Sequence, residues 1–530
     1  MRIETLPGYE VTASSATPVS PAPSPAPALT RRASLNAVQA LLDYGGKLLV
    51  GFVVTPILVT TLGSAVYGVW EMLSRLIGYM TAADARPTEA LRLLVARRQG
   101  LNDAAGDRRA VGSALVVWLL FVPVVVVVGG VLVWLAPAIT RVAAGLRGAV
   151  YLTAALLVVT FMVGALAAVP ESVLRGMNLG YKRMGLQAGL SVVGGVLMVL
   201  AVRRGLGIAG VAASQVVLGV LTGICFWYLA HRYVSWFGVG RPQRHEVRSL
   251  LGISGWLAVG ELIAKVSLAS DVVILGAVLS SSLVTTYVLT GYAARIALGL
   301  HFLVATAAMP GLGGVLGERQ FARATQLRRE LLSLTWVFST VIGATILLWN
   351  RSFLALWVGP TLYAGWLVNL LIVLSTIQTA LLRSDAYVLD AALQPRARVI
   401  ISAVAGVLAL GIGLALAPGF GMAGVCVGLL VGRAVQSVAY PILVSRSLGE
   451  SIQLPWESMI RPALASVLVL GVATAMGQRL LVQSWVLCAG LLALSFALCV
   501  PIVLFAGLAR ADRQQLMARV QRIIGGMRRG

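Results

Sequence analysis

Long apolar segments, separated by short polar ones, dominate this sequence and constrain its fold. A helix needs about 20 mostly apolar residues to cross the hydrocarbon of a membrane. Continuous runs of this length favour helices over the alternating strands of a barrel. We therefore predict an all-α, polytopic membrane protein with about 14 transmembrane helices, at residues 34–62, 66–84, 111–135, 149–174, 184–202, 207–230, 249–276, 283–307, 330–349, 362–392, 398–417, 421–444, 462–480 and 484–508.

The composition excludes a water-soluble enzyme. Only 12% of the residues are charged and the mean hydropathy is +0.90, whereas soluble domains carry about 25% charged residues. The four cysteines all fall inside apolar runs and lack the spacing of metal ligands. We expect them to be packing residues, with no disulfide, no metal and no cofactor.

The distribution of Lys and Arg orients the chain. If the N-terminus lies inside, the predicted cytoplasmic segments carry 29 basic residues and the outer segments carry six. Basic loops remain on the cytoplasmic side of a membrane. The bias predicts a multi-pass protein of the cell inner (plasma) membrane with both termini in the cytoplasm. The net charge of +23 reflects this orientation, so we expect no binding of nucleic acid.

Two tails flank the predicted helices. Residues 1–33 are rich in Pro, Ala and Ser and lack the apolar core of a signal peptide, which predicts a disordered cytoplasmic tail. In residues 509–530, Leu516, Val520 and Ile523 share one helical face while arginines occupy others. This pattern favours a basic amphipathic cytoplasmic tail on the anionic inner leaflet. A solvated tail is the alternative.

An internal repeat divides the chain into two lobes. The run GLGIAGV at 205–211 recurs as GFGMAGV at 419–425, an offset of 214 residues. Three further matches keep the same order: Val173-Leu174 with Val388-Leu389, Asp43 and Lys47 with Glu261 and Lys265, and Tyr67 and Arg75 with Tyr287 and Arg295. Such repeats in transporters place the binding site between the halves. We predict an N-lobe at 34–232, a C-lobe at 233–446 in the same orientation, and helices 13–14 at 447–508 outside the repeat.

Ionisable side chains within the predicted helices are the candidate site. A charge in the bilayer core costs several kcal/mol unless it faces a partner or a wet cavity. Acids placed four residues before several of the basic residues suggest a simpler alternative, in which each pair merely neutralises itself. Basic positions outnumber acidic ones, so we expect a net-positive cavity that prefers an anion, and the planar fork of arginine suits phosphate. The basic positions are Lys47, Arg75, Lys265, Arg295, Arg383 and Arg433, and the acidic ones are Asp43, Glu71, Glu261 and Asp271.

Several motifs resemble those of a known family. They are Leu62-Gly63, Tyr67-Gly68-Val69-Trp70, Gly78-Tyr79, Asp271-Val-Val-Ile-Leu-Gly276, Ala308-Met309-Pro310, Trp357-Val358-Gly359 and the turn at 419–425. Together, over residues 35–450, they resemble the polysaccharide transporters. These are the Wzx-type flippases of the multidrug/oligosaccharidyl-lipid/polysaccharide exporter superfamily. The chain departs from the family at Asp84-Ala85-Arg86-Pro87, where such proteins read Asp-Leu-Gly.

The resemblance implies transport of a polyprenyl-pyrophosphate-linked oligosaccharide from the cytoplasmic to the outer leaflet by alternating access. Such a substrate is a repeat unit of O-antigen, capsule or exopolysaccharide. In this hypothesis the six basic residues bind the pyrophosphate, and the four acids couple an ion or orient the basic groups. Membrane lipid is a further partner, and so are a glycan polymerase and chain-length machinery.

Three other functions compete with this one. A multidrug or cation antiporter of the same fold calls for an acidic cavity, which the charge count opposes. A lipid II flippase has fourteen helices, but its N-terminal signature is not evident. A membrane glycosyltransferase, ligase or polymerase needs sizeable outer loops and a catalytic constellation. Here the outer connections are short and no Ser/His/Asp or paired-carboxylate set occurs, so we predict that the chain is not an enzyme.

Overall fold

The computed structural model describes residues 26–84, 86–98, 103–392, 395–449, 456–510 and 512–518. These residues are almost wholly helical and include no strand, which confirms the predicted all-α class. The helices are α1 (Ala26–Leu62), α2 (Ser64–Gly78), the 3-10 helix η1 (Tyr79–Ala82), α3 (Pro87–Arg98), α4 (Ala104–Thr140), η2 (Ala144–Leu146), α5 (Arg147–Gly176), η3 (Gly180–Arg183), α6 (Leu186–Arg203), α7 (Gly207–Tyr233), α8 (Arg244–Val278), α9 (Ser281–Thr290), α10 (Tyr292–Gly317), α11 (Phe321–Trp357), η4 (Pro360–Leu362), α12 (Trp366–Ala391), α13 (Pro395–Leu448), α14 (Trp456–Arg479) and α15 (Trp485–Gly507).

Each of the fourteen predicted segments falls on a helix. Among the described residues, ten helices are long and apolar enough to cross a membrane. Helix α9 and the first part of α10, to Leu303, meet the same criteria only together, and they are bent by 53° at the break between them, as in a broken span or a re-entrant loop. The remaining predicted segments coincide with α2, with α8 and with the second half of α13, whose 54 residues hold two of the segments.

A glycine explains why α13 contains two spans. Gly421 has a φ of 58°, in the left-handed region that glycine tolerates, and the chain reverses there. Its partner in the predicted repeat, Gly207, has a φ of 56° and lies at the turn between α6 and α7. Beyond the kink the two halves of α13 pack closely, so that a Cβ on Gly428 would overlap the backbone of Gly413. The repeated sequence therefore forms the same kind of turn twice.

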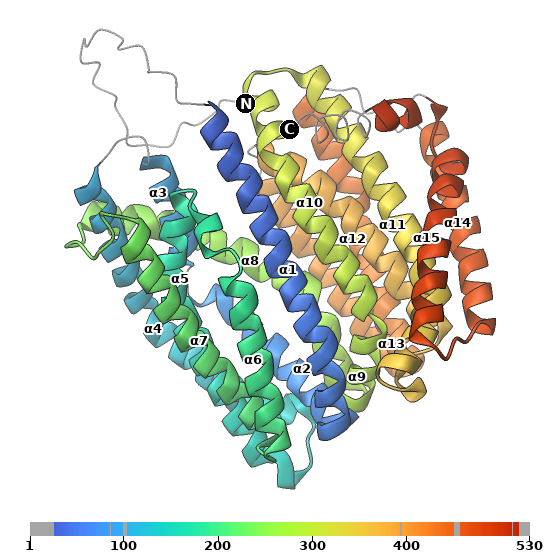
Figure 1. The fold of residues 1–530 in the computed structure, drawn as a ribbon, viewed down its shortest axis with the longest axis horizontal. Helices are drawn as coiled ribbons and strands as arrows, with labels where there is room; N and C mark the ends of the chain where they lie inside the picture. The colour runs from blue at the N-terminus through green and yellow to red at the C-terminus, as the bar shows by residue number, and fades with distance from the viewer. Residues whose placement is uncertain are drawn as a thin grey trace.

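Two groups of helices and an outer pair build the molecule (Figure 1). In the first group α5 packs on α7 and α1 on α6; in the second α12 packs on α11 and α13. Helices α14 and α15 pack on α11, outside both groups. The start of α1 and the end of α15 lie at the same end, which is the upper end of Figure 1. Which end faces the cytoplasm stays a prediction.

The two groups meet at the lower end of Figure 1. Helix α2 packs against α9, where a Cβ on Gly68 would overlap the carbonyl oxygen of Ser281. Thr285 Oγ1 donates a hydrogen bond to the Ser64 carbonyl at 2.6 Å. Trp357 Nε1 of α11 donates to the carbonyl of Phe52 in α1 at 2.7 Å, and the two rings stack. These contacts hold the lobes together at that end.

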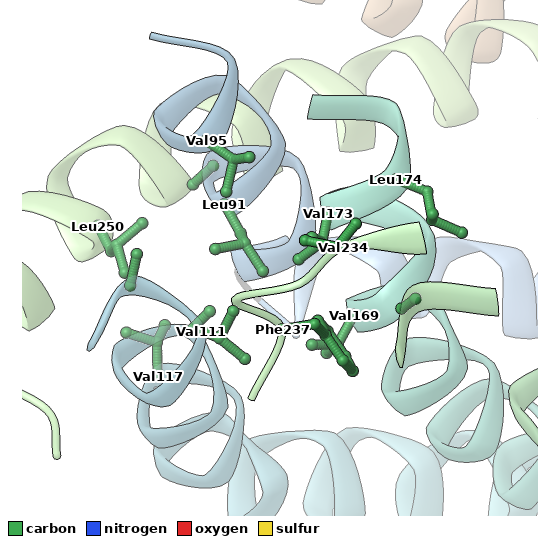
Figure 2. Close-up of a cluster of buried hydrophobic side chains, with 14 residues drawn as sticks. Leu91, Val95, Val111, Val117, Val169, Val173, Leu174, Val234, Phe237 and Leu250 are labelled. Carbon is green, nitrogen blue, oxygen red and sulfur yellow. The ribbon is translucent and has the colours of Figure 1, made fainter. Parts of the chain in front are cut away.

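Helix α3 is a feature that the sequence prediction missed. Residues 86–109 read as a charged connection, but Pro87 starts a helix, where the missing N–H of proline costs nothing. Leu91 and Val95 on this helix are fully buried against α4, α5 and the first turns of α8. Figure 2 shows them converging with Val111 of α4 and Leu250 of α8. A buried apolar stripe thus anchors a helix whose other side is basic.

The terminal segments differ in part from expectation. Helix α1 begins at Ala26, eight residues before the predicted start, because Ala and Leu favour helix and Pro27 occupies the first turn. Residues 1–25 of the predicted disordered tail lie outside the described residues. In the predicted amphipathic tail, residues 512–518 are helical and 519–530 lie outside the described residues.

The close approach of α2 and α9 makes a first prediction. Gly68→Ala should destabilise the protein by about 2 kcal/mol, because the added methyl group forces two backbones apart. The matched control is Gly78→Ala in the same helix, where a Cβ meets no atom within 4 Å. Thermal unfolding in detergent micelles measures both variants. Equal midpoint temperatures would show that α2 and α9 are not packed as described.

Candidate functional site

A cavity lies between α2, α8, α10, α12 and α13. We call it the central cavity. Its charged lining consists of three guanidinium groups and one carboxylate, from Arg75, Arg295, Arg433 and Asp271. Arg75 belongs to the N-lobe and the other three to the C-lobe, so the cavity spans the two halves of the repeat.

The N-lobe contributes a polar row on one face of α2. Tyr67 donates a hydrogen bond from Oη to Glu71 Oε1 at 3.0 Å. Arg75 Nη2 lies 3.7 Å from Glu71 Oε2. Spacings of four residues bring all three side chains onto one face of a helix. The predicted pair between Glu71 and Arg75 is therefore formed, with Arg75 at the cavity.

The C-lobe contributes Arg295 through the break between α9 and α10. The last carbonyls of a helix lack partners within the helix, and Arg295 Nη2 donates to one of them, on Val288. The matching tyrosine, Tyr287, donates from Oη to Asp271 Oδ2 of α8 at 2.8 Å. In the repeat, Gly291 stands where α2 has Glu71. Hence the carboxylate of this half comes from a neighbouring helix.

Arg433 enters the cavity from the second half of α13. Its side chain is buried, and Nη1 donates to Ser375 Oγ at 2.8 Å and to Thr379 Oγ1 at 2.9 Å. The two acceptors are four residues apart on α12 and so share one face. They fix the guanidinium at the wall of the cavity.

Both predicted lysines lie away from the central cavity. Lys47 is exposed and forms no ion pair within the described part of the chain. Asp43, four residues earlier, is buried and accepts a hydrogen bond from Gln39, so the predicted pair of Asp43 with Lys47 is not formed. Spacing along a helix does not reveal which way its faces are turned. Lys265 lies 4.0 Å from Glu261, as predicted, but does not line the cavity.

Glu261 has a partner that the sequence analysis did not identify. Arg86, which follows η1, donates from Nη1 to Glu261 Oε2 at 3.0 Å. Arg86 is the residue at which the chain departs from the family motif. The replacement thus supplies an ion pair between the N-lobe and α8.

A second ion-pair cluster joins α8 to the N-lobe near its first turn. Glu246 is 4% exposed. Its Oε1 lies 3.2 Å from Arg98 Nη2 and 3.8 Å from Arg109 Nε, and Ser113 Oγ lies 3.3 Å from Oε2. The sequence offered only one signal, an acid within a basic segment. Arg383, the last predicted residue, lines another cavity in the C-lobe.

The described helices thus surround a cavity with a charged lining. The family described as Polysaccharide biosynthesis protein matches residues 108–316. No curated protein matches the chain in sequence. This match supports the resemblance to polysaccharide transporters that the sequence predicts.

Solved structures share this fold at low sequence identity. A multidrug resistance MATE family transporter of the MOP superfamily, in an outward-facing conformation, is 14% identical, with a TM-score of 0.58, 79% of this chain and 96% of that chain covered. A MOP superfamily transporter from Pyrococcus furiosus, whose description notes a binding pocket of reversed polarity, is 14% identical, with a TM-score of 0.57; the match covers 79% of this chain and 96% of that chain. A point mutant of the Vibrio cholerae MATE transporter VcmN is 17% identical, with a TM-score of 0.58; the match covers 80% of this chain and 99% of that chain. All three of these solved structures are described as transporters.

The buried carboxylate of Glu246 makes a second prediction. Glu246→Gln should lower the free energy of unfolding by about 3 kcal/mol, because two arginines then lose their buried counter-charge. Glu89→Gln is the matched control, since Glu89 pairs with Arg92 at a more exposed site and such pairs contribute less than about 1 kcal/mol. Unfolding midpoints in detergent compare the two. Similar losses in both variants would contradict a special role for the buried pair.

Proposed function

We propose that this chain moves a polyprenyl-pyrophosphate-linked oligosaccharide from the cytoplasmic to the outer leaflet. The observation that carries the proposal is the convergence of Arg75, Arg295 and Arg433 in one cavity between the lobes. Three guanidinium groups against one carboxylate favour an anion. The two phosphates of a pyrophosphate offer several oxygens to planar, bidentate donors.

The acids serve to position these arginines. Glu71 Oε2 lies 3.7 Å from Arg75 Nη2, a distance longer than a charge-assisted hydrogen bond. A phosphate oxygen therefore competes readily for Arg75. Asp271, oriented by Tyr287, limits the positive charge of the cavity, which allows the substrate to leave. Protonation of either acid would couple transport to an ion gradient.

Alternating access follows from where the arginines originate. Arg75 moves with the N-lobe, whereas Arg295 and Arg433 move with the C-lobe. Rocking of one lobe against the other changes the spacing of these groups around the pyrophosphate while the substrate stays near the middle of the membrane. A cation antiporter is disfavoured because the same three charges repel its substrates.

The proposal predicts the behaviour of a double variant. Arg75→Gln/Arg295→Gln should slow transbilayer movement of a fluorescent polyprenyl-pyrophosphate oligosaccharide in liposomes at least about tenfold. The reason is that each substitution removes a charge-assisted hydrogen bond to the pyrophosphate and so weakens its binding. The matched control is Arg203→Gln/Arg204→Gln, which removes two exposed charges at the turn after α6.

The outcomes separate the function from the site. A wild-type protein that moves no such lipid, although folded, contradicts the proposed function. Equal rates for the wild type and for Arg75→Gln/Arg295→Gln retain the function and reject the central cavity as the pyrophosphate site.

A further inference from the structure

A second cavity lies within the C-lobe, between α8, α10, α12 and α13. We call it the C-lobe pocket. It lies nearer the upper end of Figure 1 than the central cavity, because its lining residues follow those of the central cavity along α10 and α12, which run upward. Its polar lining consists of Thr379, Arg383, Arg398, Ser402, Arg433, Gln436 and Tyr440.

The C-lobe pocket adjoins the central cavity. Thr379 and Arg433 line both, and Arg433 donates to Thr379 at the boundary. On α12, Ser375 faces the central cavity and Arg383 the pocket. Eight residues of helix separate these two levels by about 12 Å. A ligand that occupied both sites would have to span about this distance past Thr379 and Arg433.

Arg383 is the residue in the pocket that is prepared for an anion. Its guanidinium lies 5.2 Å from the ring centres of both Phe302 and Tyr387, which hold its plane in place. Its buried Nε has no hydrogen-bond partner among the described residues. A buried donor without an acceptor is costly, and a ligand that accepts from it gains that energy. By contrast, Arg398 is already paired with Asp390 at 2.7 Å.

The rest of the pocket offers neutral hydrogen-bonding groups. Ser402 Oγ and Tyr440 Oη are 2.7 Å apart, and Gln436 Nε2 donates to both at 3.2 Å. Hydroxyl and amide groups of this kind can donate hydrogen bonds to the hydroxyls of a sugar and accept hydrogen bonds from them. The pocket thus combines the guanidinium of Arg383, which can bind one carboxylate, with a group of neutral side chains that can hydrogen-bond to a polyol.

We infer that the C-lobe pocket binds an acidic sugar of the transported glycan, with its carboxylate on Arg383 and its hydroxyls on Ser402, Gln436 and Tyr440. The inference rests on the proposed function and specifies its substrate class. Three guanidinium groups line the pocket. Arg398 is paired with Asp390, and Arg433 is hydrogen-bonded to Ser375 and Thr379 at the boundary with the central cavity, so Arg383 is the group left to bind one carboxylate. With the pyrophosphate in the central cavity, the adjoining pocket receives a sugar near the reducing end.

The test compares two substrates that differ at one group. One probe is a polyprenyl-pyrophosphate oligosaccharide that contains a uronic acid; the other is the same molecule with its carboxyl group reduced to a primary alcohol. Transbilayer movement of each is measured in liposomes that contain the full chain. We expect the wild type to move the acidic probe about tenfold faster than the neutral one, and Arg383→Gln to reduce this ratio to about one.

Arg396→Gln is the matched control, because it removes an exposed arginine that lines neither cavity. This variant should retain the wild-type ratio of acidic-probe to neutral-probe movement. Equal movement of the two probes by the wild type overturns the inference and leaves the proposed function standing. Movement of neither probe contradicts the proposed function itself. If Arg383→Gln moves neither probe, the ratio of acidic-probe to neutral-probe movement is measured in Arg383→Lys instead. A wild-type ratio in Arg383→Lys overturns the role of the planar guanidinium.

Discussion

The cost of placing a charge in the hydrocarbon of a membrane governs this structure. An ionisable group at that depth persists only where it meets a counter-charge, a carbonyl or a cavity. Each deep arginine meets this condition in its own way. Arg75 has a carboxylate on its own helix, Arg295 has a carbonyl freed by a helix break, and Arg433 has two hydroxyls. Because all three solutions open onto the same cavity, the energetic constraint and the candidate binding site coincide.

The repeat shows how one scheme was adapted twice. Tyr67 and Tyr287 are equivalent, and each donates a hydrogen bond to a carboxylate near the arginine eight residues later. In the N-lobe that carboxylate lies on the same helix. In the C-lobe its position is taken by Gly291, the helix is broken there, and Asp271 of α8 replaces it. The two lobes are thus alike in chemistry and different in backbone, which suits halves that move against each other.

Much of the fold follows from the sequence alone. Apolar runs located every spanning helix, and the repeated glycines located the turn in α13 that a 54-residue helix would otherwise conceal. The sequence also placed Arg75 and Arg295 correctly as neighbours of one cavity. It failed for Lys47 and Lys265, since depth along a helix says nothing about its rotation.

Long-range pairs were the other features that the sequence did not reveal. Arg86 with Glu261, and Arg98 and Arg109 with Glu246, join residues about 140 to 175 positions apart. No local pattern encodes such a pairing. Helix α3 was missed for a related reason, because Leu91 and Val95 are too few to form an apolar run, yet they are fully buried once α4 and α5 surround them.

The position of α8 has a mechanical consequence. Its first turns are tied to α3 and α4 through Glu246, its middle to Arg86 through Glu261, and its last turns pack with α9 and α13. If the two lobes moved against each other, α8 would have to lose its contacts with one of them or bend. The pair of Arg86 and Glu261 is partly exposed, whereas Glu246 is buried. In the proposed alternating access, the middle of α8 would therefore separate from Arg86 before its first turns separated from α3 and α4.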